Sequence, residues 1–114
     1  MRRLSKAIIA AALLAGTPAA AQTQHPTFLS PLAYQQYTSL STATSLSAVP
    51  ARAATALICV ETAAVRWRDD GTAPTASVGM PLSAGQCMQY FGMLSAIQFI
   101  AQSGSPVLDV SFYK

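Results

Sequence analysis

The feature that most constrains the fold is a series of short segments in residues 38–114, each alternating apolar residues with polar or small ones. Turn-forming Gly, Pro, Asp and Ser residues separate these segments. Alternation with a period of two predicts β-strands, and no apolar pattern of helical period extends over about twelve residues in this part of the chain. The sequence therefore predicts an all-β domain.

Six or seven strands are expected. They cover residues 40–46, 55–62, 64–68, 76–80, 87–91, 95–101 and 107–113. The segment 95–101 also fits one and a half turns of helix. Short strands separated by turns, such as the Asp-Gly turn within 69–72, predict a small antiparallel β-sandwich of jelly-roll-like or immunoglobulin-like build, with a small barrel as the alternative.

The alternation also assigns the two faces of each strand. Positions expected to face the core are Ile58, Val60, Val65, Trp67, Leu108, Val110 and Phe112. The intervening positions in 107–113 are expected to face outward, because successive side chains of a strand point to opposite sides of its sheet.

Residues 1–21 have the three-part order of a secretory signal peptide. Three basic side chains among residues 1–6 precede an apolar run at 7–16, and Ala19 and Ala21 occupy the small-residue positions that signal peptidase requires. The apolar run is too short to cross a bilayer, which takes roughly 20 residues. We expect cleavage after Ala21, no membrane span after cleavage, and export to the periplasm or the extracellular space.

Residues 22–37 show no clear period and contain two prolines, Pro26 and Pro31, among several glutamines. This composition is typical of an extended segment. We therefore expect a leader arm at 22–37, with Tyr34 and Tyr37 as candidate contacts, before a β-sandwich domain at 38–114.

Charge limits the classes of partner. Removal of the signal peptide leaves four basic side chains against four acidic ones: Arg52, Arg66, Arg68 and Lys114 against Glu61, Asp69, Asp70 and Asp109. Nucleic-acid binding needs a basic surface, which this balance excludes. A chain with no net charge meets little electrostatic opposition to self-association. The expected partners are further copies of the chain or another structural protein.

Cys59 and Cys87 are candidates for a disulfide, because an exported chain with an even number of cysteines permits one. Two buried free thiols are the alternative. A metal pair is disfavoured, since no further His or Cys ligands lie nearby in the sequence.

The densest charged group comprises Arg66, Arg68, Asp69 and Asp70, the candidate residues for surface recognition. One interpretation is a recognition patch in which the adjacent indole of Trp67 stacks on a sugar ring or a cation. The alternative is a charged strand face that ends in a hairpin turn and protects a sheet edge. Alternation favours the alternative, because it points Trp67 away from both arginines.

Catalytic chemistry lacks a positioned base. His25, the one histidine, falls in the expected arm, whereas nucleophilic catalysis needs a base held against its nucleophile. Glu61 with Asp69, Asp70 or Asp109 would serve glycoside hydrolysis only across a cleft, for which a domain of this size has little room. Asp69 and Asp70 supply too few oxygens for Ca²⁺. We predict no enzyme activity, no cofactor and no metal site.

The stretch RWRDDGTAPTASVGM at 66–80, with TSLSTATSL at 38–46, LSAIQFI at 94–100 and VLDVSFYK at 107–114, resembles a group of small phage and prophage structural proteins. These are thought of as virion-associated β-sandwich modules, and the resemblance spans roughly 38–114. It implies a role in assembly without catalytic residues. The export signal and the two cysteines depart from that group, and they indicate a domain of this type recruited to the periplasm or the cell exterior.

The sequence thus predicts an exported, non-enzymatic structural or interaction module that resembles phage virion proteins. The main alternative is a small periplasmic or extracellular domain that binds carbohydrate or a cell-envelope component through Trp67, Tyr90 or Tyr113. A minimal secreted hydrolase is a third hypothesis, disfavoured by the missing base.

Overall fold

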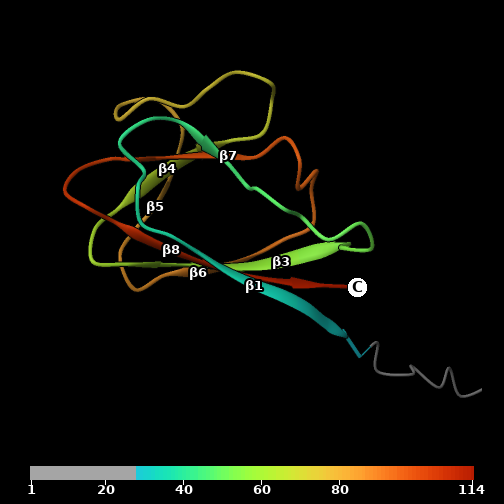
Figure 1. Cartoon of the computed structure of the whole chain (residues 1–114). Coiled ribbons are helices and arrows are strands. Elements are labelled where there is room, and N and C mark those ends of the chain that lie inside the picture. Colours follow the sequence, from blue (N-terminus) through green and yellow to red (C-terminus); the bar gives the residue numbers. More distant parts are fainter. Residues whose placement is uncertain (1–27) are drawn as a thin grey trace, which may run out of the picture.

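Residues 28–114, the part of the chain that the computed structural model describes, contain eight β-strands and no helix. Sheet A contains four strands in the order β1-β8-β3-β6, and sheet B contains the other four in the order β2-β7-β4-β5. The strands are β1 (Pro31–Tyr37), β2 (Thr44–Ser45), β3 (Thr55–Glu61), β4 (Val65–Arg68), β5 (Met80–Leu82), β6 (Cys87–Tyr90), β7 (Gln98–Ala101) and β8 (Val107–Tyr113). The two sheets form the layers seen in Figure 1. The predicted small antiparallel β-sandwich is confirmed.

The connectivity is that of a jelly roll. Strands pair antiparallel from the two ends of the chain inward, β1 with β8, β2 with β7, β3 with β6 and β4 with β5. The long hairpin that results is rolled up by two lateral pairings, β3 with β8 and β4 with β7. This order differs from the ABED and CFG sheets of an immunoglobulin domain. Of the two predicted builds, the strand order matches the jelly roll.

The core lies between the two sheets and follows the alternation seen in the sequence. From sheet A, β3 contributes Ala56, Ile58 and Val60, and β8 contributes Leu108, Val110 and Phe112, all at most 1% exposed. Sheet B and its loops contribute Val65, Leu82, Leu94, Ile97 and Phe99. Full burial of a side chain such as Phe112 stabilises a fold by roughly 1.5–3 kcal/mol. The predicted inward-facing residues of β3 and β8 are confirmed.

The prediction of a leader arm over residues 22–37 is wrong for residues 31–37. This segment is β1, an edge strand of sheet A that pairs with β8 from Tyr37 opposite Leu108 to Pro31 opposite Tyr113. An edge strand tolerates Pro31 at its first position, because no ladder donor is needed there. The inward side of β1 carries Ala33, Gln35 and Tyr37, so the strand lacks the aliphatic alternation that marks β3 and β8. The domain therefore begins before residue 38 and includes β1.

Three other segments differ from their predicted extents by more than one residue. Within 40–46 only Thr44–Ser45 is a strand, although Leu40 and Leu46 are buried. Residues 76–79 form bends, and β5 begins at Met80. Of the segment 95–101, only the part from Gln98 is a strand, and the helical alternative is wrong. In each case turn residues shorten the strand that alternation alone would allow.

The predicted signal peptide at 1–21, and His25, lie outside the described residues. Within residues 28–114, no helix is long and apolar enough to cross a membrane.

Candidate functional site

A hollow beside β4 and β5, here called the β4–β5 hollow, is the candidate functional site. Its volume is about 530 Å³. It is lined by Trp67, Arg68, Asp69, Asp70, Val78, Gly79 and Met80. Trp67 and Arg68 end β4, Met80 begins β5, and the other residues come from the loop that joins these two strands in sheet B.

Arg66 holds the loop that builds this hollow. Its Nε donates to the carbonyl oxygen of Ala76 at 3.0 Å, and its Nη1 donates to that of Gly79 at 2.9 Å. Gly79 has a φ of 145°, and a Cβ at this position would lie 3.1 Å from the carbonyl oxygen of Trp67. The loop can pass this close to β4 only with glycine there. The guanidinium of Arg66 therefore positions the loop backbone, and Arg66 does not line the hollow.

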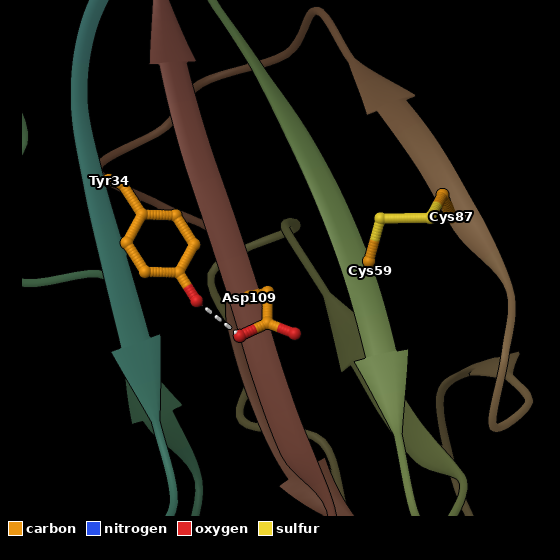
Figure 2. The surroundings of a disulfide bond; sticks show 4 residues. All are labelled: Tyr34, Cys59, Cys87 and Asp109. Atoms are coloured by element: carbon orange, nitrogen blue, oxygen red, sulfur yellow. Dashed lines mark hydrogen bonds between the residues drawn. A yellow bond between two sulfur atoms is a disulfide. The ribbon is translucent and has the colours of Figure 1, made fainter.

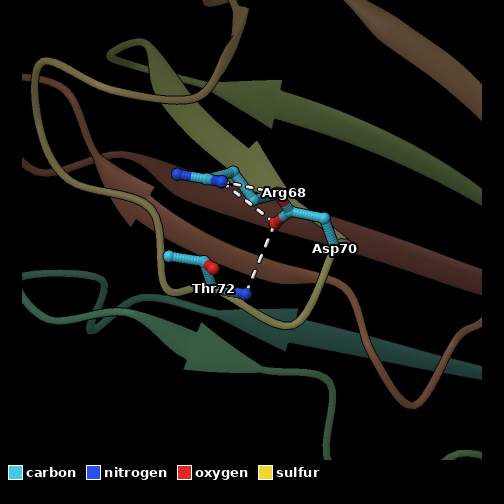
Figure 3. Close-up of polar contacts among 3 residues, drawn as sticks. All are labelled: Arg68, Asp70 and Thr72. Atoms are coloured by element: carbon cyan, nitrogen blue, oxygen red, sulfur yellow. Dashed lines mark hydrogen bonds and ion pairs between the residues drawn. The ribbon is translucent and has the colours of Figure 1, made fainter.

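Arg68 and Asp70 form an ion pair at the rim of the hollow. The Nε and Nη2 of Arg68 donate to the two carboxylate oxygens of Asp70 at 3.0 and 2.5 Å, as Figure 3 shows. The backbone N–H of Thr72 donates to the same carboxylate at 3.3 Å. Hydrogen bonding to Arg68 lowers the pKa of Asp70, and the same contact raises the pKa of Arg68. Both groups are charged at neutral pH, so the rim presents a fixed dipole of opposite charges.

Asp69 ties the hollow to the other sheet. Its carboxylate accepts a hydrogen bond of 2.8 Å from the hydroxyl of Tyr90, which belongs to β6 in sheet A. The Tyr90 ring packs edge-on against Trp67, with ring centroids 6.1 Å apart and an interplanar angle of 73°. Burial is the larger cause and the hydrogen bond to Asp69 the smaller one, and together they raise the pKa of Tyr90 to about 12. These contacts hold Trp67 and Asp69 in place across the two layers.

Two apolar side chains of the hollow remain uncovered. Val78 is 52% exposed and Met80 is 56% exposed. Phe91 and Met93, in the segment that follows β6, are also strongly exposed. The backbone carbonyl of Met93 lies 3.4 Å from the Tyr90 hydroxyl that contacts Asp69, which places this segment beside the same end of the sandwich. Contiguous exposed apolar groups mark interaction surfaces.

The predicted recognition residues divide between two tasks. Arg68, Asp69 and Asp70 line the hollow together with Trp67, whereas Arg66 binds loop backbone. Val78 and Met80 were missed as site residues, because alternation placed them in a strand at 76–80 and gave no sign that their side chains stay exposed. Trp67 is half-buried and packs against the core while lining the hollow.

The outer face of sheet A carries a separate polar cluster. Cys59 and Cys87 stand directly opposite each other on β3 and β6 and form a disulfide. On the same face Tyr34 donates to Asp109 Oδ1 at 2.6 Å, as Figure 2 shows. Gln36 Nε2 donates to the same oxygen at 2.9 Å.

Glu61 is a diagonal neighbour of Asp109 across strands β3 and β8, and this is one of the three pairings considered from the sequence. Hydrogen bonding to the Asp109 carboxyl raises the pKa of Glu61, while the hydrogen bonds from Tyr34 and Gln36 lower the pKa of Asp109. The other two pairings, with Asp69 or Asp70, would join different sheets: Glu61 ends β3 in sheet A, and both aspartates follow β4 in sheet B.

Tyr90 and Tyr113, the other two aromatics considered for carbohydrate binding, are placed differently from Trp67. Tyr90 is 7% exposed and its hydroxyl is bound to Asp69. Tyr113 ends β8, where it pairs with Thr55 and Pro31 in sheet A.

Among residues 28–114, no three His, Cys, Asp or Glu side chains gather closely enough to hold a metal ion. Comparisons with models of protein families, with curated proteins and with solved structures find no match to this chain.

Proposed function

We propose that this protein is an exported, non-enzymatic structural module that assembles with further copies of itself through the β4–β5 hollow. The observation that carries the proposal is the exposure of Val78 and Met80, which flank Gly79, where Arg66 hydrogen-bonds the loop backbone. An uncovered apolar surface on a preorganised loop loses little conformational entropy on binding, which favours association.

Charge supports a second copy of the chain as the partner. Residues 22–114 carry equal numbers of basic and acidic side chains, so two copies have no net repulsion to overcome. The rim of the hollow carries both signs, Arg68 and Asp70, and a two-fold arrangement can set each charge against its opposite in the other copy. The resemblance to virion-associated modules agrees with such a role.

The acidic pair supports a role without catalysis. Glu61 and Asp109 are diagonal neighbours on the outer face of strands β3 and β8, where neither residue is buried. Glycoside hydrolysis places its two carboxyl groups on either side of a substrate bond inside a cleft.

The proposal is tested by removing the apolar wall. Val78→Ser with Met80→Ser should weaken association of the purified protein at least tenfold, measured by light scattering after size-exclusion chromatography. Phe28→Ser is the control, because Phe28 is 83% exposed, more than Val78 or Met80, but precedes β1 and does not line the hollow. Association that survives the double substitution, or is lost equally in the control, contradicts assembly through the hollow.

A second candidate function is binding of a carbohydrate or a cell-envelope component in the same hollow. Trp67 lines the hollow beside the Arg68–Asp70 pair, and sugar sites commonly combine an aromatic face with charged hydrogen-bonding groups. Trp67 is the one tryptophan of the chain, so its fluorescence reports on this site alone. A saturable change in that fluorescence with glycans, in a protein that stays monomeric, favours this function over assembly.

A further inference from the structure

The Cys59–Cys87 disulfide lies on an open surface rather than in the core. Cys87 is the first residue of β6, an edge strand of sheet A, and it is exposed; Cys59, on β3, is half-buried. Figure 2 shows the bridge standing on the same face of the sheet as Tyr34 and Asp109. A thiol in solution can therefore reach the sulfur of Cys87 while the domain stays folded.

The neighbours of this disulfide are acidic. Asp109 stands directly opposite Cys59 in the β3–β8 register, and Glu61 follows two residues along β3 on the same face. Hydrogen bonds from Tyr34 and Gln36 keep the pKa of Asp109 low, so this carboxyl group is ionised at neutral pH.

The basic side chains of residues 28–114 lie elsewhere. Arg66 and Arg68 belong to sheet B, and Arg52 lies in the loop before β3. Lys114 follows Tyr113, which pairs with Thr55, four residues or roughly 13 Å along β3 from Cys59. The negative charge beside the disulfide is therefore not offset locally.

We infer that the Cys59–Cys87 disulfide is a thiol-exchange site that reacts faster with thiols carrying a positive charge than with anionic ones. The attacking species is a thiolate, which the carboxylates repel, and a cationic group on the same molecule offsets that repulsion. The site lies on the sheet opposite the β4–β5 hollow and goes beyond the proposed function.

The exchange proceeds in two balanced steps. The thiolate sulfur of the incoming amine-bearing thiol bonds to Cys87 Sγ, the Cys59–Cys87 bond breaks, and Cys59 leaves as a thiolate that takes up a proton. The thiolate of a second small molecule then attacks the small-molecule sulfur of the mixed disulfide. Cys87 is released and takes up a proton, and the two small molecules leave joined as a disulfide. Two small thiols lose two electrons and two protons, and the protein disulfide gains them.

The experiment compares three thiols on the folded, full-length protein: cationic cysteamine, neutral mercaptoethanol and anionic mercaptoethanesulfonate. Each second-order rate is divided by the rate of the same thiol on hydroxyethyl disulfide, which removes intrinsic differences in reactivity. The normalised ratio of cysteamine to mercaptoethanesulfonate should be about tenfold at low salt and should fall towards one in about 1 M salt.

Variants connect this selectivity to the carboxylates. Asp109→Asn with Glu61→Gln should reduce the ratio to about twofold or less, because both negative charges are removed. The amide oxygen of Asn can still accept the hydrogen bonds of Tyr34 and Gln36, so the local structure is kept. Arg52→Gln, a charge change distant from the disulfide, should leave the ratio unchanged. Equal normalised rates for all three thiols, or reduction that occurs only at the rate of global unfolding, would overturn the inference. Circular dichroism verifies that each variant is folded.

Discussion

The hydroxyl of Tyr90 in sheet A donates a hydrogen bond of 2.8 Å to the carboxylate of Asp69, which follows β4 in sheet B. The two residues are 21 positions apart in the chain and join opposite layers of the sandwich at the edge of the β4–β5 hollow. This contact anchors Asp69, one of the residues that line the hollow, to a residue of the core.

Tyr90→Phe removes this bond without changing the ring. We expect a loss of about 1 kcal/mol in the free energy of unfolding, because Tyr90 is nearly buried and its partner is charged, while the exposure of Asp69 limits the effect. Urea denaturation followed by Trp67 fluorescence measures the change. Tyr113→Phe, on the outer side of sheet A, serves as the control, and equal losses in the two variants would show that the bond contributes nothing.

The same contact predicts behaviour at alkaline pH. The pKa of Tyr90 is raised to about 12 in the folded protein, above the ordinary tyrosine value of about 10. The stability that accompanies this raised pKa is fully present below about pH 10 and is lost as the pH rises towards 12. Ultraviolet titration of tyrosinate should show a late-ionising tyrosine that is missing in Tyr90→Phe. If the tyrosine that Tyr90→Phe removes from the titration is one that ionises at about pH 10, the raised pKa is refuted.

Gly92→Ala should destabilise the domain. A Cβ on Gly92 would lie 2.4 Å from the Tyr90 hydroxyl oxygen and 2.5 Å from the ring carbon that bears it, so the ring must shift from its place in the core. Overpacking of this kind costs about 1–3 kcal/mol. Denaturation in the Tyr90→Leu background provides the control, since a shorter side chain leaves room for the methyl group. An unchanged cost in that background would mean that the Tyr90 ring is not the obstacle.

Removal of the disulfide should cost more than either substitution. The bridge closes a loop with a sequence separation of 28, and the chain-entropy model assigns such a loop about 3–4 kcal/mol of stabilisation. Cys59→Ser with Cys87→Ser should lower the free energy of unfolding by about this amount, measured by urea denaturation against the oxidised wild type. The wild type under a reducing agent should match the double variant. A loss below about 1 kcal/mol would show that β6 is held by its ladder and by Thr55 alone.

The sequence predicted the centre of the sandwich better than its edges. Strands β3 and β8 alternate cleanly because one face of each is fully buried, as with Ile58 and Val110. Strand β1 lacks that signal and reads as an arm in the sequence, because this edge strand has Gln35 and Tyr37 on its inward side. Pairing of the chain ends, β1 with β8, depends on contacts between distant residues that no local pattern encodes.

The candidate site was predicted in part for the same reason. Arg68, Asp69 and Asp70 stood out by charge and lie at the hollow. The role of Arg66 depends on the return of the loop at Gly79, and the exposure of Met80 depends on β5 forming a sheet edge. Both are consequences of tertiary structure.

The most direct test of assembly through the β4–β5 hollow is acrylamide quenching of Trp67 measured as the protein is concentrated. Trp67 is the chain's one tryptophan and lines the hollow. If a second copy covers the hollow, the quenching constant should fall by at least about half over the same concentrations at which sedimentation shows association. A protein that remains monomeric, or one that associates while Trp67 stays equally accessible to acrylamide, would contradict the account.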